Sequence, residues 1–368
     1  MWYYWPENYM WSYQLARILG HTTVYGGSQY SECLEAASRI TLGDYNSWFT
    51  EWNRLGDRVL AQANEAMEKG NKESARVHYL RAADYIRLGE FFLQPEDSRK
   101  NETYEKGINA FKKGATLLDN PPIPIEIPYE DSFLPGYFYR SPNSGKSPVM
   151  VMFGGLDSTA EEVYYALAPY LLERGIGLIA VDGPGQGGAL RMNHIASRYD
   201  YEKAGTAVFD WAIEQPEIDP ERIGIMAWSM GGYMAARIAA FEPRYKVCGI
   251  FSAVYDYSEM WANRPDDHPL ANIFKHVMGV DNIADAREKL KKYNLRNGIA
   301  EQIKCPTFIL HGEDDRQGNI DQAYRVYNAL TCPKWLHIIP SGHTGDVHCQ
   351  ADNHTQAFPL FDWIKNTL

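Results

Sequence analysis

The hydrophobic pattern of the chain changes near residue 120, at Asn120-Pro121-Pro122-Ile123-Pro124. Before this proline-rich point, apolar residues recur at helical spacing, which predicts helices over 56–69 and 72–92 separated by a turn. After it, continuous apolar runs alternate with amphipathic stretches, which predicts buried parallel strands joined by helices. The expected strands are Pro148–Phe153, Gly177–Val181, Arg222–Ala227, Val247–Ser252, Thr307–His311 and Trp335–Ile339, and the expected helices include Glu161–Arg174, Tyr201–Glu214 and Ile320–Leu330.

This change of pattern predicts two domains of different class. Residues 1–120 are expected to form a helical N-terminal domain. Residues 121–368 are expected to form an α/β catalytic core, with a mostly parallel sheet covered by helices on both faces. The segment at about 257–297 breaks the alternation with Trp261 and a charged helix, so we interpret it as an insertion. In such sheets the functional residues gather at the carboxyl ends of the strands.

Aromatic residues are concentrated at the start of the chain, where seven of the first thirteen residues are aromatic: Trp2, Tyr3, Tyr4, Trp5, Tyr9, Trp11 and Tyr13. This density is typical of residues that pack a small domain or form a contact between subunits. We favour packing over a role in lining a substrate site. The contact between subunits is a second hypothesis, and it predicts a homodimer.

Charge and composition narrow the class of partner. The 368 residues include 36 Lys+Arg and 47 Asp+Glu, which gives a net charge of −11. The chain has no basic cluster, and both observations argue against nucleic-acid binding.

The sequence also bears on location and cofactors. No charge-free run is long enough to span a membrane, and Met1–Glu7 lacks the features of a secretory signal. Five scattered cysteines without a CxxC motif indicate a reducing, cytoplasmic location and no metal site. Residues 182–188 lack the Gly-Lys-Ser/Thr of a phosphate loop, so no nucleotide or other cofactor is expected.

Ser229 is the candidate nucleophile. It lies in Ala227-Trp228-Ser229-Met230-Gly231, between an apolar strand and a helix rich in small residues. A nucleophile on a sharp turn of this kind needs small residues two positions to either side, because strand and helix approach closely there. Ala227 replaces the usual first glycine and remains small. Ser229 in a bare pattern could simply cap the helix, but the strand-turn-helix context favours catalysis.

A serine nucleophile needs a base that is oriented by an acid, and in this fold they follow in the order Ser, acid, His. A late strand ends in His-Gly-Glu-Asp-Asp, which makes Asp315 the candidate acid and leaves Asp314 solvated or bonded to the turn. Two histidines, His343 and His348, follow the last strand, and their spacing does not decide which is the base. His354 is expected on a helix surface.

The oxyanion that forms during acyl transfer needs two backbone N–H donors. The residue after the nucleophile, Met230, is expected to supply one of them. The loop after the first core strand, Phe153-Gly154-Gly155-Leu156, is expected to supply the other from Gly155 or Leu156, because paired glycines let the backbone approach a substrate.

Several of these motifs together resemble one family. Residues 154–159, 182–187 and 345–349, the Ser229 turn and His-Gly-x-x-Asp at 311–315 are similar to the α/β-hydrolases related to 2,6-dihydroxypseudooxynicotine hydrolase and the FrsA-like esterases. That set includes fungal hydrolases encoded beside polyketide synthases. The resemblance covers the whole chain and implies an α/β-hydrolase fold whose N-terminal helical domain caps the active site. It further implies Ser229 as nucleophile, Asp315 as acid and His348 as base.

The resemblance also implies a reaction class, a metal-free serine hydrolase. The bond cleaved would be an ester, a thioester or the C–C bond of a ketone, in a medium-sized apolar, polyketide-derived substrate. Relatives that cleave C–C bonds use an additional acid after the next strand, and Asp256 and Glu259 lie in that region. The alternative is condensation or acyl transfer at the same site, which the product mass would distinguish from hydrolysis. A non-enzymatic binding role is a third hypothesis, and the complete Ser-Asp-His set argues against it.

Overall fold

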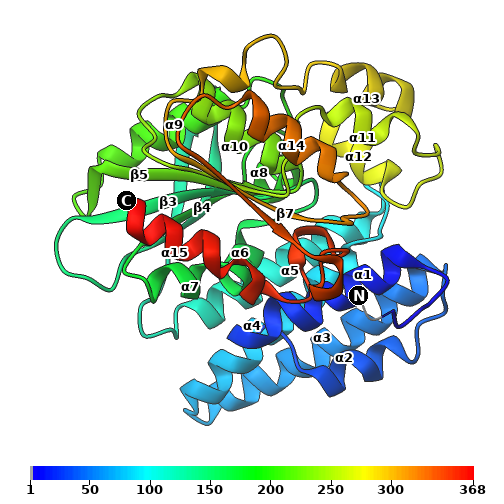
Figure 1. Ribbon diagram of the computed structural model, residues 1–368. Helices are drawn as coiled ribbons and strands as arrows, with labels where there is room; N and C mark the ends of the chain where they lie inside the picture. Colours follow the sequence, from blue (N-terminus) through cyan, green and yellow to red (C-terminus); the bar gives the residue numbers. More distant parts are fainter. Residues whose placement is uncertain (1–2) are drawn as a thin grey trace. The chain divides into compact units, whose positions relative to one another are not determined.

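All six predicted strands and the expected alternation of strands and helices are present (Figure 1). The computed structural model describes residues 3–368, apart from the side chain of His343. The chain forms two compact units. We call Met1–Pro122 together with Ala351–His354 the helical unit, and Ile123–Gln350 together with Thr355–Leu368 the sheet unit.

The described part of the helical unit, from residue 3 onward, contains five α-helices, and the sequence pattern identified two of them. The helix expected over 56–69 begins earlier, because the Asp44 side chain accepts from Asn46 N–H and Ser47 N–H at 2.9 and 3.1 Å and so caps an N-terminus at Tyr45. The helix expected over 72–92 agrees to within two residues. The five helices are α1 (Tyr9–Arg17), α2 (Tyr30–Ala37), α3 (Tyr45–Glu68), α4 (Lys72–Glu90) and α5 (Ser98–Ala115).

The aromatic start of the chain packs the helical unit. Trp11 is 1% exposed, and its ring lies 5.0 Å from that of Trp48 and 5.3 Å from that of Phe92, centroid to centroid. Trp5 joins the same cluster through an edge contact with Trp11. Trp2 lies outside the described residues. Packing therefore accounts for these rings, and the homodimer stays a prediction.

A short return segment, Ala351–His354, completes the helical unit from the far end of the chain. A Cβ added at Gly20 would lie 2.2 Å from the carbonyl oxygen of Asp352, so this contact requires a glycine. The rings of His21 and His354 lie 3.9 Å apart, centroid to centroid. The expectation that His354 lies on a helix surface is wrong, because this contact leaves it 2% exposed.

The sheet unit is built on eight strands in the order β1-β2-β4-β3-β5-β6-β7-β8. The pairs β1–β2 and β2–β4 are antiparallel, and every other neighbouring pair is parallel. The carboxyl ends of the parallel strands therefore meet at one edge. The strands are β1 (Ile123–Tyr129), β2 (Ser132–Tyr139), β3 (Ser147–Phe153), β4 (Gly177–Val181), β5 (Ile218–Trp228), β6 (Cys248–Phe251), β7 (Thr307–Gly312) and β8 (Lys334–Ile339).

Helices cover both faces of this sheet (Figure 1). One face carries α6 (Ala160–Ala166), α7 (Ala168–Leu172) and α15 (Phe358–Thr367), and the other carries α9 (Glu202–Ile213), α10 (Met230–Phe241) and α14 (Ile320–Ala329). The single helix expected over 161–174 is two helices. Leu167 leaves the helical conformation at φ −135°, because Pro169 cannot continue the hydrogen-bond ladder of the preceding helix. A short helix, α8 (Gly187–Arg191), follows β4.

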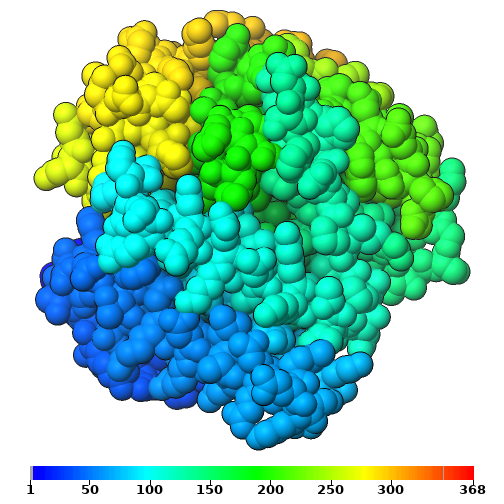
Figure 2. All heavy atoms as spheres, turned by 180° about the vertical axis from the view of Figure 1, so that it is seen from behind, coloured from blue at the N-terminus to red at the C-terminus, as the bar shows by residue number. Residues whose placement is uncertain are grey.

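The segment at 257–297 lies between β6 and β7 and carries three short helices, α11 (Tyr257–Ala262), α12 (Ala271–Met278) and α13 (Ile283–Leu290). Figure 2 shows this segment (yellow) at the surface beside the stretch that contains Ser197 (green). Ser197 N–H donates to Val277 O at 2.8 Å, and the Tyr293 hydroxyl lies 3.1 Å from Ser197 Oγ. These bonds anchor the segment to the core.

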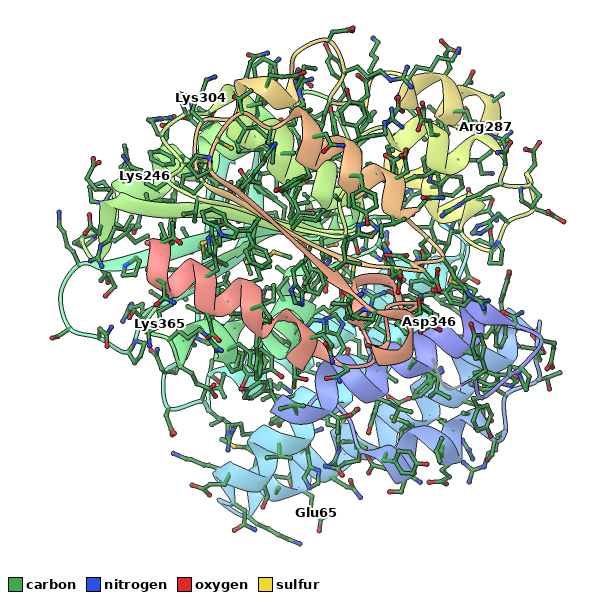
Figure 3. All side chains as sticks on the ribbon, viewed as in Figure 1. Glu65, Lys246, Arg287, Lys304, Asp346 and Lys365 are labelled. Carbon is green, nitrogen blue, oxygen red and sulfur yellow. The ribbon has the colours of Figure 1, made fainter. Side chains whose placement is uncertain are left out.

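Figure 3 shows Lys246, Lys304 and Lys365 of the sheet unit at the outside of the molecule. Within residues 3–368, no helix has the length and apolarity that a bilayer-spanning helix requires. The five cysteines all lie in this described range, and none forms a disulfide.

Candidate active site

Ser229 sits on a strained turn between β5 and α10. Its backbone has φ 59° and ψ −127°, a conformation that non-glycine residues rarely adopt. A Cβ added at Gly231 would lie 2.5 Å from Gly154 O and 2.7 Å from the Cβ of Ala227. The small residues on both sides of Ser229 are therefore required by close contact. They let the turn close and present the half-buried hydroxyl at the carboxyl edge of the sheet.

The structure brings Ser229, His348 and Asp315 into one hydrogen-bonded chain. His348 Nε2 lies 2.8 Å from Ser229 Oγ. His348 Nδ1 lies 2.7 Å from Asp315 Oδ2 and 2.9 Å from Oδ1. With Nδ1–H donating to the carboxylate, Nε2 is free to accept the serine proton.

The Asp315 carboxylate is fixed from several sides. Its Oδ1 accepts from Gln317 N–H at 2.8 Å and Gly318 N–H at 3.0 Å. Its Oδ2 accepts from the hydroxyl of Ser252 at 3.2 Å. Asp314, one residue earlier, is exposed, and its side chain accepts from the Ser341 hydroxyl. Asp315, which its spacing from the strand end favoured, is therefore the buried carboxylate, and Asp314 is the exposed one.

His311 holds the loop that carries Asp315 in place through two hydrogen bonds. Its Nδ1 accepts from Ala253 N–H at 3.0 Å, and its Nε2 donates to Gly318 O at 2.8 Å. Both ring nitrogens are used by the backbone, and burial lowers the pKa of His311. A neutral imidazole with these two partners shapes the turn and does not exchange protons with Ser229.

His348 and Asp315 form a buried pair, and each residue shifts the pKa of the other. Burial alone lowers the pKa of His348, but the Asp315 carboxylate outweighs it and raises that pKa above its usual range. Burial raises the pKa of Asp315, and His348 outweighs it and lowers that pKa. Asp315 is therefore ionised at neutral pH and stabilises the imidazolium of His348.

His343, the other candidate base, lies in the short 3₁₀-helix Ser341–His343 after β8. Its side chain is outside the described part of the structure. The choice between the two histidines therefore rests on the contacts of His348, which the motif Gly-Asp-x-His-Cys also favoured.

The loop after β3 borders Ser229, because a Cβ added at Gly155 would lie 2.9 Å from the Cβ of Ser229. Gly155 and Leu156 are the alternatives for the second donor, and Gly155 N–H already donates to Ser158 Oγ at 2.9 Å. Leu156 N–H takes part in no hydrogen bond within residues 3–368. Met230 is the first residue of α10, where a backbone N–H has no partner inside the helix. Leu156 and Met230 are thus the donors that remain.

The two candidate auxiliary acids are bound to arginines. Asp256 is 1% exposed, accepts from Ser258 N–H at the start of α11 and pairs with Arg296 at 2.5 Å. Glu259 pairs with Arg296 at 2.7 Å and with Arg325 at 2.5 Å. Both carboxylates therefore have cationic partners within the insertion and α14.

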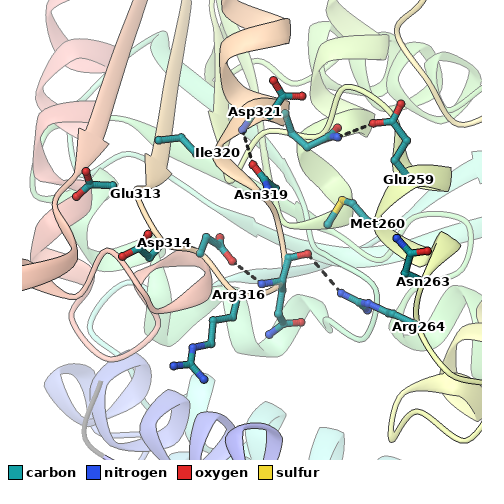
Figure 4. Close-up of a pocket in the computed structure, with 13 residues that line it drawn as sticks. Glu259, Met260, Asn263, Arg264, Glu313, Asp314, Arg316, Asn319, Ile320 and Asp321 are labelled. Atoms are coloured by element: carbon teal, nitrogen blue, oxygen red, sulfur yellow. Dashed lines mark hydrogen bonds between the residues drawn. The ribbon is translucent and has the colours of Figure 1, made fainter.

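A polar cavity of about 670 Å³ is lined by residues of α11, of the segment after β7 and of the start of α14 (Figure 4). The carboxylates of Glu259, Glu313 and Asp314 surround it, so its chemistry does not suit an apolar acyl group. Its lining residues are Glu259, Met260, Asn263, Arg264, Glu313, Asp314, Asp315, Arg316, Gln317, Asn319, Ile320, Asp321 and Gln322. In the described range, no three His, Cys, Asp or Glu side chains are arranged to hold a metal ion.

Sequence reasoning missed three polar side chains that touch this site: Ser252, Ser158 and Gln186. Ser252 follows β6 in a left-handed conformation (φ 62°), and no local sequence pattern predicts this conformation. Ser158 and Gln186 lie inside the motifs Gly-Gly-Leu-Asp-Ser-Thr and Asp-Gly-Pro-Gly-Gln-Gly. These motifs identified the loops, but not the contacts that each side chain makes.

Comparison with known proteins gives concordant matches. The sequence family described as Esterase FrsA-like matches residues 32–312. Hydrolase LUC6 of Fusarium sp is 34% identical, over 87% of this chain and 86% of its own length, and 20-hydroxy-prefusarin hydrolase FUS2 of Gibberella moniliformis has the same identity and coverage. The crystal structure of 2,6-dihydroxy-pseudo-oxynicotine hydrolase superposes with a TM-score of 0.81 at 25% identity, covering 96% of this chain and 95% of that one.

Proposed function

Because this chain belongs to the FrsA-like esterase family of α/β-hydrolases, we propose that it is a serine hydrolase with Ser229 as its nucleophile. The observation that carries the proposal is the 2.8 Å contact between His348 Nε2 and Ser229 Oγ, on a histidine whose other nitrogen is held by Asp315. A serine is a weak nucleophile until a base takes its proton, and this chain supplies that base in hydrogen-bonding range.

The first half of the reaction follows from this geometry. As Ser229 Oγ attacks a substrate carbonyl, its proton moves to His348 Nε2, and Asp315 stabilises the imidazolium. The carbonyl oxygen becomes an oxyanion that accepts from Leu156 N–H and Met230 N–H. When the tetrahedral intermediate collapses, the leaving group takes the proton from His348 and an acyl-enzyme remains.

The second half repeats these steps with water. His348 removes a proton from water, which attacks the acyl carbon and forms a second oxyanion at the same two N–H groups. Collapse returns the proton to Ser229 Oγ and releases the acid. The balance is one water consumed for each bond cleaved.

A substrate class follows from the relatives. The name of one relative gives 20-hydroxy-prefusarin as its substrate, and another is called a 2,6-dihydroxy-pseudo-oxynicotine hydrolase. We propose a medium-sized, polyketide-derived metabolite for this chain, cleaved at an ester, a thioester or a ketone C–C bond. Asp256 and Glu259 remain the candidates for an auxiliary acid in C–C cleavage, and their arginine partners would have to release one of them for that role.

Labelling with a fluorophosphonate tests the proposed nucleophile. We expect one adduct per chain, and we expect peptide mapping by mass spectrometry to place it on Ser229, because only a serine beside a general base reacts readily. Denatured protein serves as the control and should not react. An adduct on another residue, or none on the folded protein, would contradict the proposal.

The replacement Asp315→Asn is expected to change both the rate and its pH dependence. Only neutral His348 can act as a base, so activity rises as pH increases through its pKa. Asp315 raises that pKa, and without its charge burial lowers it, so the rising limb should move to lower pH. The plateau should fall about 10⁴-fold, because the imidazolium loses its partner and the required tautomer is no longer enforced.

The matched control is Asp314→Asn, which removes an exposed carboxylate one residue away. We expect its pH profile and rate to match those of the wild type. The measurement is initial rate against pH with a p-nitrophenyl ester. A rising limb that stays in place in Asp315→Asn would separate Asp315 from the base and count against the proposed chain of contacts.

A further inference from the structure

A buried amide, the side chain of Gln186, binds two carbonyl groups of the loop after β3. Its Nε2 donates to Gly154 O at 2.7 Å and to Gly155 O at 3.2 Å, and its Oε1 accepts from Gly183 N–H at 3.1 Å. Gln186 is 2% exposed. With two carbonyls on one side and an N–H on the other, only one orientation of the amide satisfies its surroundings.

Gln186 thereby determines the direction of a neighbouring N–H group. The Gly155 carbonyl and Leu156 N–H belong to one peptide unit, and in a planar trans peptide they point in opposite directions. No peptide bond in the described range is cis. The carbonyl held by Gln186 therefore aims Leu156 N–H away from Gln186, on a loop that borders the nucleophile. A Cβ added at Gly155 would lie 2.9 Å from the Cβ of Ser229.

Ser158 provides a second, independent tether of the same loop. Its Oγ accepts from Gly155 N–H at 2.9 Å and from Trp228 Nε1–H at 2.8 Å. Trp228 is the residue before Ser229, so Ser158 joins the loop to the nucleophile turn. The two tethers hold successive peptide units and, among residues 3–368 as described, leave Leu156 N–H without a protein acceptor.

We infer that Gln186 is a positioning residue for the oxyanion hole, acting through the peptide between Gly155 and Leu156. This inference rests on the proposed function. Asp182 supports the arrangement, because its carboxylate accepts from Ala160 N–H at 2.7 Å and from Gly188 N–H at 2.8 Å. It thus ties together the two loops that Gln186 connects. A donor fixed before the reaction costs no reorganisation when the oxyanion forms.

The replacement Gln186→Met tests this inference, because methionine keeps the length and apolar bulk of the side chain and removes both donors. The substrates are p-nitrophenyl butyrate and its thionoester, whose sulfur accepts hydrogen bonds weakly. With the oxoester we expect kcat to fall about ten- to a hundredfold, with KM within about twofold. The thionoester should lose much less, so the ratio of the two kcat values should fall.

Two further variants control the measurement. Gln215→Met removes a similar bond, from Gln215 Nε2 to Trp211 O at 3.0 Å, just after the end of α9, and should leave the ratio unchanged. Ser158→Ala removes the second tether and should also lower the ratio. If Gln186→Met does not fold, the nearly isosteric Gln186→Glu, which removes the donors to Gly154 O and Gly155 O, is measured in its place and should lower the ratio.

The outcomes separate this inference from the proposed function. If folded Gln186→Met loses activity equally with both esters, or loses none, the inference is overturned while the hydrolase proposal stands. If the wild type has no esterase activity dependent on Ser229, the proposed function fails, and the inference fails with it. A lower oxoester-to-thionoester ratio in Gln186→Met and Ser158→Ala, with Gln215→Met unchanged, supports it.

Discussion

Replacing Ser229 by alanine is expected to lower kcat for ester hydrolysis about 10⁴- to 10⁶-fold while the protein stays folded. Alanine keeps the Cβ, so the contacts that close the turn are preserved, but it removes the oxygen that attacks the substrate. KM for the ester should change little, because the hydroxyl contributes to bond making more than to binding. The measurement is kcat and KM with p-nitrophenyl butyrate, together with the melting temperature.

The control for Ser229→Ala is another serine of the sheet unit. Ser141 lies after β2, and its hydroxyl donates to Gly175 O at 2.9 Å, at the opposite end of the sheet from Ser229. Ser141→Ala should retain activity within about twofold. Turnover by Ser229→Ala at a rate close to that of the wild type would exclude the acyl-enzyme route and favour a reaction in which His348 acts directly on substrate or water.

The second large effect is expected for His348→Ala, with a loss of kcat again of about 10⁴- to 10⁶-fold. His348 touches both Ser229 and Asp315, so its removal leaves the nucleophile without a base and the acid without a partner. The double variant with Ser229→Ala should be no slower than either single variant, because residues that act as one unit are not additive.

His343→Ala is the matched control for His348→Ala, five residues earlier in the same loop. We expect it to retain activity within about twofold, and we expect added imidazole to restore part of the activity of His348→Ala only. A large loss in His343→Ala with an active His348→Ala would exchange the roles of the two histidines. The same protein samples can be labelled with the fluorophosphonate, which reports directly whether Ser229 forms an adduct in each variant.

Most of the parallel strands could be predicted from the sequence because they are buried on both faces and read as continuous apolar runs, as in Val149–Phe153. The two antiparallel strands at the start of the sheet unit could not. β1 carries Pro124 and Pro128, and proline normally argues against a strand. β1 lies at the edge of the sheet, where a missing N–H costs no ladder bond on the open side.

The residues of the candidate site also differ in how far the sequence could predict them. Ser229 and Asp315 could be identified because each lies at a fixed distance from a strand end that the pattern predicts. His348 could not be separated from His343 by spacing, since the loop after β8 has no regular period, and only the family motif favoured it. Gly155 and Leu156 were equivalent in sequence, and the bond from Gly155 N–H to Ser158 Oγ distinguishes them. Such side-chain bonds depend on tertiary placement.

The return segment Ala351–His354 has a consequence for how this protein is made. The ribosome adds about 5 to 20 residues per second, so residues 123–350 require about 10 to 50 s. During that time the first 122 residues have been synthesised, but the piece that packs against Gly20 and His21 has not. The helical unit therefore cannot reach its final packing until residues 351–354 have been added. His348, the proposed base, lies three residues before that piece, so a nascent chain holds the proposed nucleophile Ser229 well before it holds this histidine.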